Sequence, residues 1–574
     1  MRTSAHPPDW LRQEVEAFLT EQETNYSAEL SLLGRRWVSP GYHSSIPTGQ
    51  WVHSTRESLA YAACLVWRAD PADLERAART IDAVIDLQER RMTDPAYGIW
   101  PWMHEEPLAR MSPPDWNWAD FCGNLLLTIH CIADRSGGAS SAAAAELPGD
   151  LVARMLAAVE AASLAVFRRN VTPGYTNIAI MGAVLTTVAG EVLGQQWLLD
   201  YGRERLERVV EHTRLHGDFN EYNSPTYTVV ALEEAERALY LSRDPRVRAA
   251  AEALRLHAWT VIADHFHPGT DQWAGPHSRT YSDFIKPNVA RRLSRSVGRT
   301  LRIADQPAEE RSILDDVPNL VPELPCPDDL LDRFEPEVTR PRRVQNRFWV
   351  GDDGRARTGY TWVERDLSLG SVSDDSMWTQ RRGLIAYWRG AERPAVFRVR
   401  ALKDGRDFAS MMIRVVQHER MALVAVTPAG GFGDYHLSLD RSPDGCYDAG
   451  RLAVRFSVAG AGAEVSRVRG GWLLASGRHG VFVQPVEAVC RAEPLDWVGA
   501  AIGDDCAAVD VTIARSVRFC PSDEADTRVV FVARLVDLDG SEPNTPSLSD
   551  CRCTRGDDSV TWTSGDLTLT IPRR

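Results

Sequence analysis

Apolar residues recur at intervals of three and four positions through roughly the first 310 residues of this 574-residue chain. Within residues 71–90, one face of a helix is marked by Leu74, Ala77, Ala78, Ile81, Val84 and Ile85. Comparable stripes cover residues 57–67, 150–167, 177–194, 195–214, 227–241 and 244–266. Because successive amphipathic helices joined by short links pack as antiparallel hairpins, this series predicts an (α/α) toroid, or incomplete barrel.

Beyond residue 343 the apolar residues change to a period of two. Alternating segments separated by turn residues lie at 395–402, 411–418, 421–428, 452–460, 481–489, 507–519 and 527–538. This pattern is typical of a many-stranded antiparallel β-sandwich. Between the two regions helix continuation is blocked by Pro318, Pro322, Pro325, Pro327, Pro336 and Pro341. We therefore predict a multidomain α+β chain with an N-terminal toroid at 1–316, a proline-rich linker at 317–343 and a C-terminal β-sandwich at 344–574.

The overall charge restricts the class of partner. The formal net charge of -14 and isoelectric point near 5.6 argue against a nucleic-acid partner, because phosphate binding needs a basic surface. No segment reaches about 18 uninterrupted apolar residues, so no membrane span is expected. The N-terminal residues show no secretion signal, and the ten cysteines include no C-x-x-C pair. We therefore expect reduced thiols and a cytoplasmic location.

One segment, HGDFNEYNSPTYTVV at residues 216–230, concentrates acidic, amide and phenol side chains directly before an apolar helical run. Such groups suit a β-elimination beside a uronic acid, in which a weakly acidic C5 proton is removed from the sugar. That reaction needs donors that neutralise the carboxylate and a base near C5. A tyrosine can act as this base when nearby cations lower its pKa from about 10.

The same segment resembles the glycine-aromatic-Glu-Ser-Pro-Tyr signature of the heparinase II/III-like and alginate-lyase-like polysaccharide lyases. Upstream, TPGYTNIAIMGAVLTTVAGE at residues 172–191 resembles the helix start where those enzymes carry an Asn that binds the substrate carboxylate. The resemblance implies a toroid followed by a sandwich, with Tyr227 as the catalytic acid/base and Asn177 as the carboxylate-binding amide. The family often has His after each of these residues, whereas this chain has Thr228 and Ile178, so the subfamily and substrate stay open.

A further polar loop, DHFHPGTDQWAGPHSRTYSDF at residues 264–284, follows a predicted helix. His277, Arg279 and Tyr281 alternate in it and can project together as a charge clamp with a second hydrogen-bond donor, because an arginine fork suits a carboxylate. The alternative is that Arg279 is a structural ion-pair partner and His277 a capping group. His265 and His267 form an H-x-H pair, but no third ligand is evident and no metal is expected.

Tryptophan is abundant at 18 residues, and residues 97–124 are especially rich in it. The faces of aromatic rings accept the apolar faces of pyranose rings, so this segment is a candidate sugar-stacking wall with a polar tip. Its members are Trp100, Trp102, Trp116, Asn117, Trp118 and Asp120. Trp116 and Trp118 are equally consistent with core residues at a helix end.

In the predicted sandwich, residues 371–390 place Trp378, Gln380, Arg381 and Arg382 just before a strand. We take Gln380 and Arg381 as candidate substrate contacts, although an arginine pair also serves as a solvated guard of a sheet edge. His418 and His436 each stand alone and are expected to be structural.

Glu221 and Tyr222 lie within the motif itself and are candidate substrate-binding residues. The alternative role for both is support, with Glu221 orienting Arg279 or Tyr227. Tyr227 opens an apolar helix and could equally belong to the core, but the surrounding motif favours catalysis.

These features predict a lyase that cleaves a uronic-acid-containing oligosaccharide or polysaccharide by β-elimination, without a cofactor. Asn177, Arg279 and His277 would neutralise the carboxylate, Tyr227 would transfer the proton, and an imported oligosaccharide would favour an exo mode. One alternative is an α/α-toroid glycoside hydrolase, whose carboxyl pair would come from Asp115, Asp120, Asp218, Glu221 and Asp283. Another is a non-catalytic glycan-binding protein, since fold alone does not fix function. The sequence leaves a homodimer open.

Overall fold

Helices come first and strands second in the computed structural model of the chain, as the sequence pattern predicts. The structure describes residues 8–136, 147–303, 312–336, 340–390, 392–503, 505–524, 526–538, 550–557 and 559–572. Unit 1 comprises Met1–His212, Val230–Ala258 and Ala308–Pro325, and unit 2 comprises Thr213–Val229, Trp259–Pro307 and Cys326–Arg574. These units are discontinuous in sequence, whereas the boundaries at 316 and 343 follow chain order and remain a prediction.

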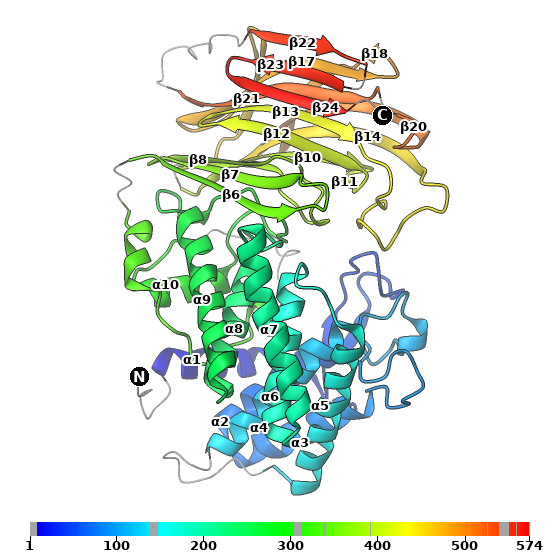
Figure 1. Ribbon diagram of the computed structural model, residues 1–574, viewed down its shortest axis with the longest axis vertical. Coiled ribbons are helices and arrows are strands. Elements are labelled where there is room, and N and C mark those ends of the chain that lie inside the picture. Colours follow the sequence, from blue (N-terminus) through cyan, green and yellow to red (C-terminus); the bar gives the residue numbers. More distant parts are fainter. Residues whose placement is uncertain are drawn as a thin grey trace. The chain divides into compact units, whose positions relative to one another are not determined.

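Unit 1 is built from helices packed in two layers (Figure 1). An inner row is formed by α2 (Thr55–Arg68), α4 (Trp118–Ser136) and α6 (Thr176–Leu193), each contacting the next. Each inner helix is followed by an outer one, namely α3 (Pro71–Asp86), α5 (Gly149–Arg169) and α7 (Gln196–His216). The pairs α2 with α3 and α4 with α5 are hairpins, as the short links between stripes predict. Unit 1 also includes α1 (Asp9–Gln22) and most of α8 (Tyr227–Leu241) and α9 (Pro245–His265).

The two helix layers differ in burial as an inner and an outer row should. In α3 the predicted stripe is correct, since Ala77, Ile81, Val84 and Ile85 are buried and the opposite face is exposed. In α6 nearly every residue is buried. Within the described residues α6 is the one helix long and apolar enough to cross a membrane, yet 83% of it is buried inside the protein, as in a core helix.

Unit 2 contains a sandwich of two large antiparallel sheets (Figure 1). Sheet I has the order β19 (Trp497–Gly503), β20 (Cys506–Phe519), β14 (Tyr447–Ala459), β10 (Ala395–Lys403), β9 (Leu384–Trp388), β8 (Leu367–Val372), β7 (Ala356–Val363) and β6 (Arg342–Val350), with β11 (Arg406–Asp407) on β10. Sheet II has the order β12 (Met411–His418), β13 (Met421–Pro428), β21 (Arg528–Asp537), β17 (His479–Cys490), β16 (Gly471–Ser476) and β15 (Glu464–Val468), with β18 (Glu493–Pro494) on β17. Sheet III consists of β22 (Cys551–Arg555), β23 (Ser559–Ser564) and β24 (Leu567–Pro572).

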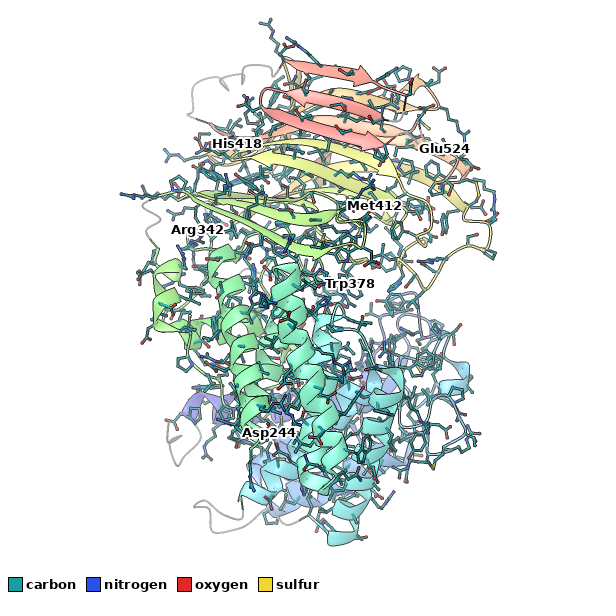
Figure 2. The ribbon with its side chains drawn as sticks, in the orientation of Figure 1. Asp244, Arg342, Trp378, Met412, His418 and Glu524 are labelled. Carbon is teal, nitrogen blue, oxygen red and sulfur yellow. A yellow bond between two sulfur atoms is a disulfide. The ribbon has the colours of Figure 1, made fainter. Side chains whose placement is uncertain are left out.

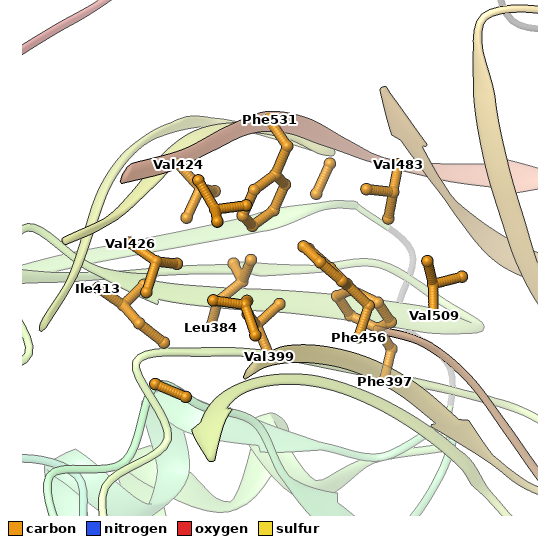
Figure 3. Packing of buried hydrophobic residues seen from close by; sticks show 14 of the residues in the cluster. Leu384, Phe397, Val399, Ile413, Val424, Val426, Phe456, Val483, Val509 and Phe531 are labelled. Carbon is orange, nitrogen blue, oxygen red and sulfur yellow. The ribbon is translucent and has the colours of Figure 1, made fainter. Parts of the chain in front are cut away.

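The period-two pattern places one face of the central strands of sheets I and II in the sandwich core (Figure 3). Sheet I contributes Leu384, Phe397, Val399, Phe456 and Val509 to this core, and sheet II contributes Ile413, Val424, Val426, Val483 and Phe531. The other face of sheet II is also apolar and packs on sheet III through Leu423, Ala425, Val530, Val532, Val560, Trp562, Leu567, Leu569 and Ile571.

The motif segment and the loop around residue 277 belong to unit 2, where they pack on β7, β8 and β9. The Thr361 hydroxyl donates to the Gly275 carbonyl at 2.6 Å. The backbones of His277 and Arg382 exchange hydrogen bonds of 3.1 and 2.8 Å. A Cβ at Gly370 would overlap the backbone of Gly275, so this close approach requires glycine. The chemistry-bearing segments are therefore anchored on a rigid sheet. The same unit holds β4 (Phe266–His267), β5 (Gln272–Trp273), α10 (Pro287–Val297) and the 3₁₀ helix η5 (Asp328–Phe334).

Cysteine usage differs from the prediction. Cys446 and Cys520 form a disulfide that joins the segment before β14 to the end of β20, 74 residues apart in sequence. The expectation that all thiols are reduced is therefore wrong for this pair, and the predicted cytoplasmic location loses the support it drew from them.

Candidate active site

Tyr227 opens α8, and a serine three residues earlier fixes this position. The Tyr227 backbone N–H donates to the Ser224 hydroxyl oxygen at 2.9 Å, as at a helix N-cap. The Ser224 hydroxyl in turn donates to the backbone carbonyl of Arg279. One small side chain thereby connects the start of α8 to the loop that carries Arg279 and Tyr281.

The phenols of Tyr227 and Tyr281 meet at the surface of unit 2. Their hydroxyl oxygens are 2.8 Å apart, and Tyr281 is 41% exposed while Tyr227 is partly exposed. The Arg279 guanidinium donates through Nη2 to the Tyr281 hydroxyl at 3.0 Å. Its Cζ also lies 4.3 Å from the centroid of the Tyr227 ring. A cation in this position stabilises negative charge on either phenol oxygen.

Arg279 is held in place from several sides. Its Nε donates to the Gln380 side-chain oxygen at 3.2 Å, and its Nη1 lies 3.5 Å from a Glu221 carboxylate oxygen. The Trp378 ring, in the loop between β8 and β9 (Figure 2), lies 5.0 Å from the Arg279 Cζ. Glu221 and Gln380 are buried, and both hold the Arg279 guanidinium in place. For Glu221 this is the supporting role that the motif offered as an alternative.

His277 is not the cationic group that its place in the loop suggests. Its side chain is buried, and burial lowers its pKa to about 3, so the imidazole is neutral at neutral pH. Its Nδ1 donates to the Asn223 backbone carbonyl at 2.8 Å, which leaves Nε2 unprotonated in the neutral ring. His277 therefore supplies no positive charge to a substrate carboxylate and instead secures the motif segment.

Tyr222 is also displaced from its expected role, because it is fully buried. Its ring stacks on Phe348 at 4.7 Å, and its hydroxyl lies 2.9 Å from His265 Nε2. A Cβ at Gly359 would overlap the Tyr222 ring. Tyr222 is thus a core residue that attaches the motif to β6 and β7, and it has no surface to offer a substrate.

The arginine pair at 381–382 likewise serves the interior of unit 2. Arg381 forms an ion pair with Asp375 at 3.0 Å and donates to the Met411 carbonyl, so it is not positioned as a substrate contact. Arg382 donates to an Asp283 carboxylate oxygen at 2.7 Å. Neither arginine is the solvated edge guard considered as the alternative.

Both members of the H-x-H pair have each ring nitrogen engaged. His265 contacts the Val261 carbonyl through Nδ1 at 2.8 Å, in addition to Tyr222. His267 contacts the Thr270 hydroxyl at 2.7 Å and the Glu364 carbonyl at 2.9 Å. Within the described ranges, no group of three or more His, Cys, Asp or Glu side chains is arranged to hold a metal ion.

The remaining predicted residues belong to unit 1. Asn177 is the second residue of α6 and is buried. Asn117 donates to the Tyr175 hydroxyl at 3.4 Å and accepts from Arg169 at 2.5 Å, so it lies beside the segment that leads into α6. Asn117 and Tyr175 therefore lie near the start of α6, and the carboxylate-binding role of Asn177 stays a prediction.

The tryptophan-rich segment forms a small core of its own. Trp102 is buried, donates through Nε1 to Asp115 at 3.1 Å and packs on Trp118 with centroids 5.2 Å apart. This cluster lies beside a small sheet formed by β1 (Tyr26–Ser27), β2 (Leu32–Arg36) and β3 (Trp51–Ser54). Trp102 is therefore a core residue, whereas Trp116 and Trp118 are half-buried and keep part of their faces accessible.

Of the carboxylates considered for a hydrolase, Asp115, Asp120, Asp218 and Glu221 are buried and Asp283 is half-buried. Burial alone would raise the pKa of Asp283, but Arg398 and Arg382 outweigh it and hold the pKa at about 2. Asp218 accepts from the Phe219 N–H at 2.7 Å and from Asn346 at 3.1 Å, and Glu221 holds Arg279. In unit 1, burial raises the pKa of Asp120 to about 7. This side chain belongs to α4 and is buried inside the unit.

Two residues of the motif have a structural role that the sequence reading missed. Asn223 adopts a left-handed conformation with φ of 46° and donates to the carbonyls of Ala274 and Pro276 at 2.9 and 2.8 Å. Ser224 caps α8 as described above. An Asn-Ser pair three to four residues before an apolar helix is a recognisable turn and cap signal.

Comparisons with known proteins give the following likenesses. A family model described as "Domain of unknown function (DUF8769)" matches residues 26–291. No curated protein sequence matches the chain. Among solved structures, the chain is similar to heparinase III at 9% identity and a TM-score of 0.46, covering 100% of this chain and 92% of that one.

Two further solved structures are similar. One is the chondroitin AC lyase of Streptomyces coelicolor A3 in complex with chondroitin sulphate, at 12% identity, coverage of 99% and 86%, and a TM-score of 0.49. The other is a Paenibacillus xanthan lyase, at 9% identity, coverage of 98% and 60%, and a TM-score of 0.42. At TM-scores below 0.5, the likeness does not extend to activity or substrate.

Proposed function

We propose that this protein is a lyase that cleaves a uronic-acid-containing glycan by β-elimination. The proposal is carried by one observation, the surface arrangement in which the Tyr227 hydroxyl contacts that of Tyr281 while Arg279 lies over the Tyr227 ring. A phenol beside a guanidinium loses its proton more readily than an isolated phenol, and this is what a tyrosine base requires.

In the proposed reaction, the Tyr227 phenolate removes the C5 proton of the uronic acid. The electron pair of the C5–H bond forms a C4=C5 double bond, and the bond from C4 to the glycosidic oxygen breaks. The leaving oxygen takes a proton, which the Tyr227 hydroxyl is placed to return. No water is consumed in this step, and the new reducing end is formed on the leaving sugar.

Arg279 and Tyr281 support the charge changes on Tyr227. The guanidinium stabilises the phenolate before proton removal, and the Tyr281 hydroxyl donates to the same oxygen. Glu221 and Gln380 keep the guanidinium in this orientation, since an arginine fork loses its geometry without fixed acceptors. His277, being neutral and engaged with Asn223, is left out of the carboxylate clamp.

The group that neutralises the carboxylate is proposed on the sequence resemblance. Asn177 occupies the place of the carboxylate-binding amide in the second motif, and Asn117 is a second amide beside the segment before α6. An amide N–H donor lowers the cost of the enolate-like charge that develops on the carboxylate when C5 loses its proton.

A matched pair of variants tests this proposal. Wild type, Tyr227→Phe and Tyr240→Phe would be incubated with a panel of uronate glycans, and ultraviolet absorbance of the conjugated double bond would be followed. Tyr240 lies on the same helix, so its variant controls for loss of a phenol from α8. Absorbance that rises with wild type and Tyr240→Phe but not with Tyr227→Phe supports the proposal. Products without new absorbance would indicate hydrolysis, and ligand binding without product would indicate a binding protein.

A further inference from the structure

A cavity of about 120 Å³ lies in unit 1 beside the start of α6. The link between α5 and α6 contributes Asn170, Val171, Thr172 and Pro173 to its lining. The other lining residues are Ala179 of α6 and Arg205, Arg208 and Val209 of α7. The lining contains two arginines and no acid, so the cavity is electropositive.

Arg205 forms the inner part of this lining and is only 4% exposed. Its Nη1 donates to the Asn170 side-chain oxygen at 3.0 Å and to the Tyr201 hydroxyl at 3.1 Å, while its Nε has no hydrogen-bond partner. Across the ranges that the structure describes, Arg205 makes no ion pair. A buried guanidinium without a direct ion pair is costly, and an anion bound in the cavity would offset that cost.

The Asp120 carboxyl group, which interacts electrostatically with Arg205, only partly compensates this charge. Burial raises the pKa of Asp120 to about 7 against the opposing influence of Arg169 and Arg205, so much of it is protonated at neutral pH. Arg208, by contrast, is exposed and lies at the rim, with its Nε on the Glu204 carbonyl at 3.3 Å. One buried and one exposed guanidinium are therefore available to the same small anion.

An exposed aromatic cluster adjoins this cavity. Phe167 at the end of α5 is 44% exposed, and Trp197 at the start of α7 is 46% exposed. The Phe167 ring lies 5.5 Å from Trp197 and 4.9 Å from Tyr201. The Tyr201 hydroxyl also donates to Asn170 at 3.1 Å, so one hydrogen bond connects the cluster to the cavity lining. Large apolar side chains gathered at the surface in this way mark an interaction site.

We propose that α5 and α7 form a second glycan-binding site, which takes the carboxylate of an acidic pyranose in the Arg205–Arg208 cavity and its ring on Trp197 and Phe167. The combination determines the ligand class. Arginines alone would suit any small anion, whereas aromatic faces beside them suit the apolar face of a sugar that carries the anion. The site binds without reacting, because no side chain in its lining is a base aimed at a sugar carbon.

Binding of galacturonate to the full-length Tyr227→Phe protein tests the proposal by calorimetry, with galactose and inorganic sulfate as comparison ligands. Turnover is not needed, so failure of the proposed lyase activity would leave this result intact. The test variants, each in the same background, are Arg208→Gln and Trp197→Ala, whose side chains are exposed and whose loss spares the fold. The control is Arg79→Gln, which removes an exposed charge from α3.

The expected result is that galacturonate binds, that galactose and sulfate bind at least about tenfold more weakly, and that each test variant weakens galacturonate binding by about tenfold or more. Arg79→Gln should leave the affinity unchanged. Absence of galacturonate binding, or binding that neither test variant changes, would overturn the site. Equal binding of sulfate and galacturonate with no effect of Trp197→Ala would reduce it to a general anion pocket and overturn the sugar assignment.

Discussion

The hydroxyl oxygens of Tyr227 and Tyr281 lie 2.8 Å apart, although 54 residues separate them in sequence. Arg279 donates to one of these hydroxyls and lies over the ring that carries the other. Both phenols are accessible and the guanidinium is fixed by buried partners, which is the arrangement that the proposed proton transfer uses.

Removing the two phenol oxygens separately should distinguish base from helper. Tyr227→Phe is expected to lower kcat by about a hundredfold or more, because a positioned base contributes about 10²- to 10⁴-fold. Tyr281→Phe should cost less, since it removes one hydrogen bond to the base. Initial rates on an active uronate glycan measure both. Equal losses in the two variants would contradict the assignment of Tyr227 as the base.

Replacing Arg279 by lysine keeps the charge but loses the fork that contacts Tyr281, Gln380 and Glu221. We expect kcat to fall and the rising limb of the pH–rate profile to move to higher pH, because a nearby cation favours a phenolate and the lysine ammonium is no longer held over the Tyr227 ring. Arg467→Lys is the matched control, since Arg467, on β15, also lies over an aromatic ring, which belongs to Trp472. An unchanged profile for Arg279→Lys would show that Arg279 does not act on the base.

Tyr222 should matter to stability more than to catalysis. Tyr222→Ala leaves a large cavity against Phe348 and is expected to lower the free energy of unfolding by about 3–5 kcal/mol. Tyr222→Phe keeps the ring and loses only the contact with His265, so it should cost about 1 kcal/mol and retain activity. Denaturant unfolding and initial rates measure these effects. An inactive but stable Tyr222→Phe would instead place this phenol in the reaction.

Three buried histidines predict a loss of stability in mild acid. Burial lowers the pKa of His277 to about 3 and of His267 to about 4, and lowers that of His265 as well. Between these values and the unfolded pKa of about 6.5, the unfolded chain binds protons that the folded chain does not, so stability falls as pH falls. Each such histidine contributes up to about 1.4 kcal/mol per pH unit.

Two histidine variants test the predicted loss of stability in acid. His277→Asn keeps a donor for the Asn223 carbonyl but does not titrate, so the slope of unfolding free energy between pH 7 and pH 5, obtained from urea unfolding, should become shallower. The exposed His418 provides the control, and His418→Gln should leave the slope as in wild type. A slope that His277→Asn does not change would contradict a neutral buried His277.

The disulfide can be tested by counting free thiols before and after reduction. Titration of the unfolded protein should show eight thiols before reduction and ten after it, because Cys446 and Cys520 are paired and eight cysteines are free. Closing a long loop typically stabilises a protein by about 2–4 kcal/mol, so Cys446→Ser should lower the midpoint of unfolding. Cys553 is free and exposed, so Cys553→Ser should leave the midpoint of unfolding unchanged. Ten thiols without reduction would show that the pair is open.

The sequence predicted elements well where the periodicity was strong. The stripe at 71–90 became α3, and the alternating segments at 411–418 and 421–428 became β12 and β13 with these bounds. It predicted the roles of individual side chains less well, because burial depends on partners far along the chain. Tyr222 is enclosed by Phe348 and Gly359, more than 120 residues away, and nothing local to the motif indicates this.

The same limit applies to charge and redox state. The sequence around His277 predicts a cationic side chain, but burial keeps the imidazole neutral. Cys446 and Cys520 are brought together by the pairing of β14 with β20, which spacing alone does not reveal. Residues close together in one loop were easier to group, as Arg279 and Tyr281 show, because alternation in a short loop places their side chains together.

The most direct test of the central claim is the mass of the products formed from a defined uronate oligosaccharide in water enriched in oxygen-18. β-Elimination by Tyr227 predicts two fragments whose masses sum to that of the substrate, one of them absorbing in the ultraviolet, with no oxygen-18 incorporated at the cleaved bond. Tyr227→Phe should form these products at least about a hundredfold more slowly. Fragments that together gain one water carrying oxygen-18, or unchanged cleavage by Tyr227→Phe, would contradict the account.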